Sequence, residues 1–168
     1  MKLPRTLRLD ASDSVIFERA AAPGEWAVPG GFAFWDCDPA ALPGKQRQAF
    51  RAGFLGLASF GWSTLVEVAE ASAAEQAAAL ASLAAHIAAA HGAPDAAAAR
   101  AAAAEELAFA ASLCEHPLGT VLALSRSQED GALRERFRTL HQRTQAPVFA
   151  LLPEGEEEAP VHPDLTRL

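Results

Sequence analysis

An alanine-rich stretch between Ser72 and Glu115 constrains the fold of this 168-residue chain more than any other feature. Ser72 followed by Glu75 is a capping-box pattern that starts a helix, and Gly92 is a typical residue for ending one. The Pro-Asp pair in "HGAPD" starts a second helix, which we expect to end near Glu115. The pattern therefore predicts an antiparallel hairpin of two helices. Alanine buries little apolar area, so we expect close helix axes and a thin hydrophobic interface.

The segments before this hairpin carry strand patterns, interrupted by one helical pattern. "RTLRL", "SVIFER" and "GFAFW" alternate or are rich in β-branched and aromatic residues, and Pro-Gly pairs separate them, so we predict three strands within residues 1–36. "PGKQRQAFRAGFLGLASF" places Phe50, Phe54 and Leu57 on one helical face and predicts a short helix. "GWSTLVEVAEAS" alternates again and predicts a strand.

After the helical hairpin, "GTVLALSRSQEDGALRERFRTL" predicts two strands joined by a tight turn at Asp130-Gly131. Strand patterns and helix patterns are segregated along the chain, which favours an α+β fold over a parallel doubly wound one. We predict an antiparallel sheet with the helical hairpin and the short helix packed on one face. The chain is interpreted as a single domain over residues 1–153, ending in the apolar "PVFALLP", followed by an acidic and mobile tail over residues 154–168.

Charge and composition exclude several classes of function. The net charge of -7 disfavours a nucleic-acid partner, which requires many Lys and Arg contacts to phosphate. No stretch is apolar and uncharged enough to predict a membrane span or a signal peptide, so we expect no membrane association and a cytoplasmic location. Cys37 and Cys114 lie far apart without a CxxC motif, as is ordinary for structural thiols in a reducing compartment.

The residues from "RTLRLDASDSVIFERAAAPGEWAVPGGFAFWD" through "AFRAGFLGLASFGWSTLVEV", "ELAFAASLCEHPLGT" and "RERFRTL" resemble a small bacterial family of unknown function, over about residues 5–140. The resemblance implies an uncharacterised domain. It brings no catalytic residue and no activity.

Motifs of established enzymes are missing from the sequence. There is no phosphate-binding glycine loop, no G-x-G-x-x-G, no H-E-x-x-H and no G-x-S-x-G. Cys114 with His116, and Asp36 with Cys37 and Asp38, are the two candidate metal-ligand clusters, but neither has a familiar spacing. We therefore predict no metal and no cofactor, and we interpret the aspartates as an Asx-type turn before Pro39. His86 and His91 share no helical face and are expected on the solvent side.

Two groups of residues are candidates for binding. In "LRERFRTL", alternation places Arg134, Arg136 and Arg138 on one face of a strand, where guanidinium groups could hold an anion or an acidic partner, or could simply pair with glutamates on a solvated face. Most of a group of five aromatic residues are expected in the core: Trp26, Phe32, Phe34, Trp35 and Trp62. Within "GFAFW" a strand would turn Phe32 and Phe34 inward and leave Trp35 for a partner or a pocket.

Two hypotheses of function follow. The first is a non-catalytic interaction or accessory protein that docks on another subunit or self-associates through exposed aromatic and arginine residues, the types enriched in interface hot spots. The second is a small-molecule-binding protein or minor enzyme, in which the arginines hold an anionic metabolite against Trp35 or Trp62. Glu25 or His116 would then be available for acid–base chemistry.

Overall fold

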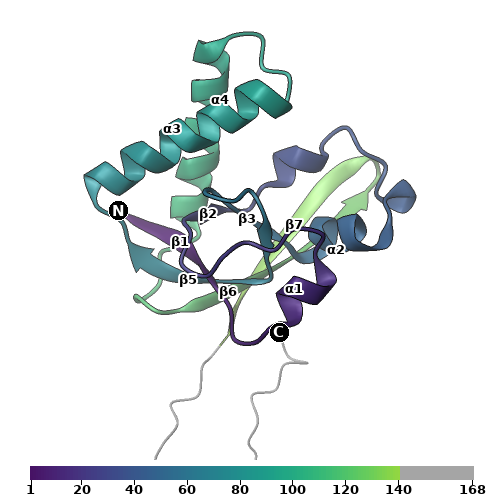
Figure 1. The fold of residues 1–168 in the computed structure, drawn as a ribbon, viewed down its shortest axis with the longest axis horizontal. Helices are drawn as coiled ribbons and strands as arrows, with labels where there is room; N and C mark the ends of the chain where they lie inside the picture. The colour runs from purple at the N-terminus through teal and green to yellow at the C-terminus, as the bar shows by residue number, and fades with distance from the viewer. Residues whose placement is uncertain (141–168) are drawn as a thin grey trace, which may run out of the picture.

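The structure is a computed structural model that describes residues 1–140, and it has two antiparallel sheets and four α-helices (Figure 1). The larger sheet has the strand order β1-β5-β6-β7, formed by Lys2–Leu7, Leu65–Glu70, Val121–Glu129 and Ala132–Leu140. The smaller sheet has the order β2-β3-β4, formed by Ala27–Val28, Phe54–Gly56 and Trp62–Ser63. The helices are α1 (Ser12–Ile16), α2 (Gly44–Ala52), α3 (Ala73–Ala90) and α4 (Ala96–Ser112), with the 3-10 helices η1 (Gly31–Phe34) and η2 (Pro39–Ala41). The prediction of an α+β fold is confirmed.

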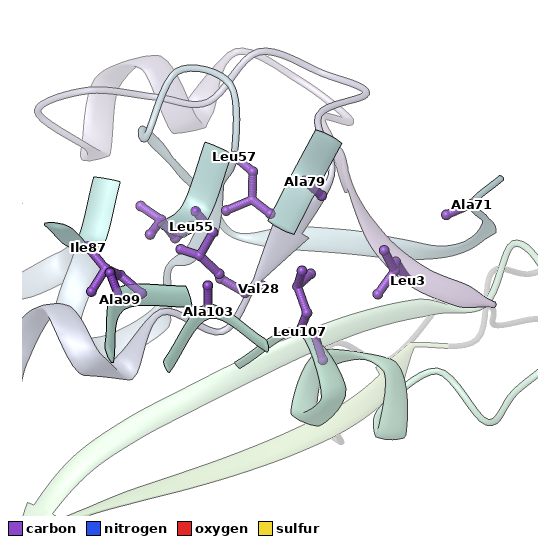
Figure 2. Packing of buried hydrophobic residues seen from close by; sticks show 12 residues of the cluster. Leu3, Val28, Leu55, Leu57, Ala71, Ala79, Ile87, Ala99, Ala103 and Leu107 are labelled. Carbon is purple, nitrogen blue, oxygen red and sulfur yellow. The ribbon is translucent and has the colours of Figure 1, made fainter. Parts of the chain in front are cut away.

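The small sheet lies between the large sheet and the helical hairpin. Ala27 and Phe54 pack in one cluster with Val66 and Val68 of β5, whereas their chain neighbours Val28 and Leu55 pack in another cluster with α3 and α4. Successive side chains of a strand point to opposite faces, so each short strand contributes to both clusters. Figure 2 shows Val28 and Leu55 near Ala103 of α4. Leu3 of β1 belongs to the same cluster as the hairpin residues, so the hairpin packs on both sheets, and the second sheet is a part of the fold that the sequence analysis did not predict.

The helical hairpin itself was predicted correctly. The Ser72 hydroxyl accepts the backbone N–H of Glu75 and the Glu75 carboxylate accepts that of Ser72, which completes the capping box. Asp95 caps α4 by accepting the backbone N–H of Ala98. The second helix ends at Ser112, three residues before the predicted end.

Two segments predicted as strands are helical. "SVIFER" begins within α1, because the Asp10 carboxylate accepts the Ser12 N–H and the Asp13 carboxylate binds the Thr64 backbone and hydroxyl. Local hydrogen bonds and an anchor to a distant residue therefore override the strand propensity of this short segment. "GFAFW" forms η1 instead of a strand, because Gly30 adopts a left-handed conformation with φ of 78° that turns the chain.

The helix predicted across Phe50, Phe54 and Leu57 ends early. α2 stops at Ala52, and Phe54 lies on β3. At Gly53 a side chain would meet the ring of Trp62, with Cβ only 2.8 Å from its nearest atom, so this glycine permits the close approach at which helix changes to strand.

The last hairpin matches its prediction closely. β6 and β7 pair over nine residues each, with Asp130 and Gly131 in the turn at φ of 53° and 78°. Leu122, Leu124 and Arg126 alternate along β6 and are all buried. On β7 the half-buried residues alternate with the exposed arginines.

No helix within residues 1–140 is long and apolar enough to cross a membrane. The predicted domain end at residue 153, the "PVFALLP" segment and the acidic tail lie outside the described residues, so these remain predictions.

Candidate functional site

A pocket of about 490 Å³ lies between η1 and the helical hairpin. Its volume is in the range typical of small-molecule and side-chain binding sites. Three parts of the chain form its wall: η1 with the residue that follows it, the end of α3 with the loop to α4, and one face of α4. We call this site the aromatic pocket, and its lining residues are Phe32, Trp35, Ile87, His91, Ala93, Pro94, Ala98, Ala102, Glu105, Glu106 and Phe109.

The 3-10 geometry of η1 places two aromatic rings in this pocket. A 3-10 helix has three residues per turn, so residues three apart lie on the same side. Phe32 and Trp35 accordingly both line the pocket, while Phe34 points the other way and packs on Phe50 and Trp62. The expected strand would have paired Phe32 with Phe34, and this part of the prediction is wrong.

Glu106 attaches η1 to the helical hairpin. Its Oε2 accepts the backbone N–H of Gly30 at 2.9 Å. Gly30 could not be replaced easily, since its φ is positive and an added Cβ would lie 2.8 Å from the Cβ of Leu55. The pocket wall is therefore fixed where a loop of irregular structure meets α4.

Burial raises the pKa of Glu106 above its ordinary value. The hydrogen bond from Gly30 and the charge of Arg126 lower it, the nearby Glu135 raises it further, and the net shift is upward. A half-buried carboxylate with a single protein donor has unused acceptor capacity. Glu106 is thus the residue in the pocket best prepared to bind a donor or a cation.

The remainder of the pocket is acidic and aromatic. Glu105 is exposed on α4, and among residues 1–140 no lysine or arginine lines the pocket. Trp35 has 76% of its surface exposed and Phe109 has 40%. An aromatic wall beside carboxylates suits a group that is apolar in part and positively charged in part.

His86 and His91 meet edge to face near this pocket, in contrast to the expected solvent-side positions, and together with Phe60, on which His86 stacks, we call them the histidine stack. Their Nε2 atoms are 3.3 Å apart, and both rings are half-buried. The His86 ring stacks on Phe60 with 3.9 Å between centroids, and His91 meets the ring of Phe32 edge-on. The helical-face argument failed because His91 follows the last helical residue of α3, so the chain can turn its ring back.

Burial lowers the pKa of both histidines. For His86 the neighbouring His91 lowers the pKa further, whereas for His91 the carboxylate of Asp36 partly opposes the effect of burial. At neutral pH the pair is therefore uncharged, with one ring donating to the other.

Arg126, like Glu106, is an ionisable residue that the sequence analysis did not single out. Its side chain is fully buried and donates to Glu135 Oε2 at 2.9 Å and to the carbonyl oxygens of Phe50 and Pro29 at 2.7 Å each. Its guanidinium also lies 5.6 Å from the centroid of Phe34. These contacts tie β6 to β7, α2 and the segment before η1. One signal was present in the sequence: the inward alternation of β6 places Arg126 on the same face as Leu122 and Leu124.

The three predicted arginines lie together as expected. Arg134, Arg136 and Arg138 are exposed on one face of β7, and we call them the arginine face. Arg134 and Arg136 approach Glu129 at 3.9 and 3.7 Å, with side chains 59% and 69% exposed. Such contacts are weak and leave the guanidinium groups accessible.

The other predicted site residues are separated from the arginines. Trp62 packs against Phe34 and two core clusters. Glu25 is buried, and its carboxylate accepts backbone N–H groups of Ala22 at 2.6 Å, Ala58 at 3.0 Å and Ser59 at 2.9 Å. Burial raises the pKa of Glu25, but these hydrogen bonds outweigh it, and the pKa lies below the ordinary value. Glu25 therefore holds two loops together.

The structure also shows the surroundings of residues from the two candidate metal-ligand clusters. Cys114 is buried, which raises the pKa of its thiol to about 11, and the backbone oxygen of His116 accepts Lys2 Nζ at 2.6 Å. Asp38 accepts the backbone N–H of Ala40, as an Asx-type turn requires. Within residues 1–140 no three His, Cys, Asp or Glu side chains gather in a way that could hold a metal ion.

Neither the curated proteins nor the solved structures provide a match to this chain. A family model does match it, over residues 1–156, and thus covers all of the described fold, the aromatic pocket and the arginine face. The expected resemblance to an uncharacterised family is confirmed, and the chain belongs to the family described as "Family of unknown function (DUF6505)".

Proposed function

We propose that this protein is a non-catalytic interaction protein, which docks on another subunit or on another copy of itself through the aromatic pocket. A cytoplasmic location is part of the proposal. The free thiols of Cys37 and Cys114 support it, because reducing compartments keep such thiols unpaired.

The exposure of Trp35 is the observation that carries the proposal. A tryptophan is the most costly side chain to leave in water, yet 76% of this one is exposed, beside a pocket whose wall continues its apolar surface. Tryptophan is also one of the residue types enriched in interface hot spots. The Trp35 side chain contributes little to the interior of its own domain, so its apolar surface is available to a partner.

The buried ionisable groups support a structural use of charge in this fold. Glu25 accepts three backbone N–H groups, Asp13 binds Thr64, and Arg126 is surrounded by carbonyl oxygens and Glu135. The buried Cys114 thiol, with its raised pKa, is protonated at neutral pH and a poor nucleophile. These groups stabilise loops and hold the packed elements of the fold together. We therefore assign recognition of a partner to the pocket.

The proposal can be tested by photo-crosslinking in cells that make the full chain. A photoreactive benzoylphenylalanine replaces Trp35, and the matched control carries the same residue at Val15, which is 67% exposed on α1. We expect discrete protein adducts at position 35, identified by mass spectrometry, that are missing at position 15. The same adducts at both positions, or no adduct at position 35, would contradict a docking role for the pocket.

An anion-binding role remains a second candidate, favoured by the alignment of three exposed arginines on one face. The test is thermal stabilisation by inorganic phosphate and by citrate. We expect both to raise the melting temperature of the wild type but not of the triple variant in which the arginine face is changed to glutamine. Lys45, Arg51 and Arg100 are exposed elsewhere, and their change to glutamine gives a control of equal charge. Equal stabilisation of both triple variants would exclude a specific anion site.

A further inference from the structure

The aromatic pocket favours a cationic occupant. Two glutamates and three phenylalanine or tryptophan rings line it, and the described part of the chain contributes neither lysine nor arginine to the lining. A guanidinium group fits such a lining well, because its flat faces stack on aromatic rings while its edge donates hydrogen bonds to carboxylates. Glu106 has acceptor capacity left after its bond with Gly30.

The arginine face offers this chemistry on the same chain. Arg134 and Arg136 are more than half exposed and approach Glu129 only at 3.9 and 3.7 Å. Arg138 is exposed two residues further along β7. The three side chains project from a single strand, which presents them as a rigid row.

The arginine face of one molecule cannot fill its own pocket. Phe137 lies between Arg136 and Arg138 in sequence, and its ring meets the pocket residue Phe109 with 5.8 Å between centroids. Alternation along β7 therefore directs Phe137 toward the pocket wall and the arginines to the opposite face of the sheet. The arginine face can therefore reach an aromatic pocket only on another molecule.

We propose that the arginine face of a second copy of this chain docks in the aromatic pocket, with a guanidinium against Trp35 and the carboxylates of Glu105 and Glu106. The inference rests on the proposed function, for which it names the partner. The two surfaces are different, so the contact is head-to-tail, and each pair keeps one free pocket and one free arginine face, on different molecules. The complementary charges make the association weaken with salt.

Sedimentation velocity over a range of protein concentrations tests this arrangement with two variants of the full chain. Trp35→Ser alters the pocket and leaves the arginine face intact, and Arg134→Gln/Arg136→Gln/Arg138→Gln does the reverse. We expect wild-type protein to self-associate at low salt and each variant alone to lose roughly tenfold or more in association constant. The control of equal charge change, Lys45→Gln/Arg51→Gln/Arg100→Gln, should associate as the wild type does.

Mixing the two variants provides the decisive measurement. A head-to-tail contact needs one intact pocket and one intact arginine face, so the mixture should form a 1:1 dimer, although neither variant associates alone. Circular dichroism and melting temperature should show both variants folded.

Three results would overturn the inference: a wild type that stays monomeric at every concentration at low salt, variants that associate as the wild type does, or a mixture that forms no dimer. These outcomes are distinct from failure of the proposed function. Adducts between position 35 and a different protein would keep the docking role of the pocket while removing the second copy as its partner.

Discussion

Two glutamates that both accept backbone N–H groups show how differently this fold uses a carboxylate. Glu25 is buried, receives three such hydrogen bonds, and its pKa is lowered. Glu106 is half-buried, receives one, and its pKa is raised. Burial opposes the charge of both residues: at Glu25 the hydrogen bonds outweigh it, whereas at Glu106 the bond from Gly30 and the charge of Arg126 do not outweigh burial and the nearby Glu135. A carboxylate whose acceptor sites are filled is structural, whereas one with unfilled sites beside a pocket is available to a ligand.

Removal of the Glu25 side chain should have the largest effect. Glu25→Ala leaves the N–H groups of Ala22, Ala58 and Ser59 without their acceptor, and we expect a loss of about 3–5 kcal/mol in the free energy of unfolding. Urea denaturation measures this loss. Glu25→Gln is the control, since its amide oxygen can retain part of the hydrogen bonding and should cost less. A loss below about 1 kcal/mol for Glu25→Ala would show that the two loops are held by other contacts.

The contributions of Glu25 and Glu106 to the free energy of unfolding should change with pH in opposite directions. The lowered pKa of Glu25 contributes stability that is present above the ordinary pKa of 4.5 and is lost as the pH falls through the folded-state pKa. The raised pKa of Glu106 contributes stability that is complete below the ordinary pKa of 4.5 and is lost as the pH rises through its folded-state pKa. Urea denaturation from acid to neutral pH should therefore show that Glu25→Gln is most harmful at neutral pH. Equal effects at all pH values would contradict the assigned shifts.

The histidine stack should add a second pH-dependent loss. The pKa values of His86 and His91 are lowered in the fold, so their contribution is intact above the ordinary value of 6.5 and is lost as the pH falls below it. His86→Phe keeps an aromatic ring against Phe60 and should make the melting temperature less dependent on pH between neutral and mildly acidic conditions. An unchanged dependence of the melting temperature on pH would show that protonation of the two histidines does not destabilise the fold.

Glu106→Gln should change stability by less than about 1 kcal/mol at neutral pH, because it removes a charge whose burial is unfavourable and keeps an acceptor for Gly30. Calorimetry of the full chain measures this change in stability. A loss comparable to that of Glu25→Ala would remove the distinction between a structural and an available carboxylate.

Trp35→Ser should have the smallest effect on stability, within about 0.5 kcal/mol, because the side chain is largely exposed. Trp62→Ser provides the contrast, since this half-buried ring packs on Phe34 and should cost several times as much. Similar melting temperatures for both variants would contradict the assignment of one tryptophan to the core and the other to the surface.

The parts of the fold that could be predicted are those in which local signals agree with tertiary packing. The capping box at Ser72 and the turn at Asp130-Gly131 are both present, and the alternation along β7 placed the arginine face correctly. Each of these signals acts within a few residues. They required no knowledge of distant contacts.

The pocket could not be predicted, because it depends on contacts between distant residues. In "GFAFW" the aromatic spacing suits a strand, but the left-handed Gly30 and its bond with Glu106, 76 residues later, hold a 3-10 helix. Only that helix brings Phe32 and Trp35 to one side. Arg126 was missed for a related reason: a charged residue on an inward position is explained only by the carbonyl groups of α2 and Pro29, which lie far away in sequence.

The alanines of α4 have a consequence beyond close helix packing. Ala98 and Ala102 lie one turn apart on the pocket wall, and each contributes a single methyl group there. The pocket has room beside these two residues because their side chains are small. A leucine at the exposed position 102 would fill that space without entering the core, so this surface can lose its binding site while the domain keeps its stability. The small side chain at position 102 is therefore needed for the pocket and not for the core of the domain.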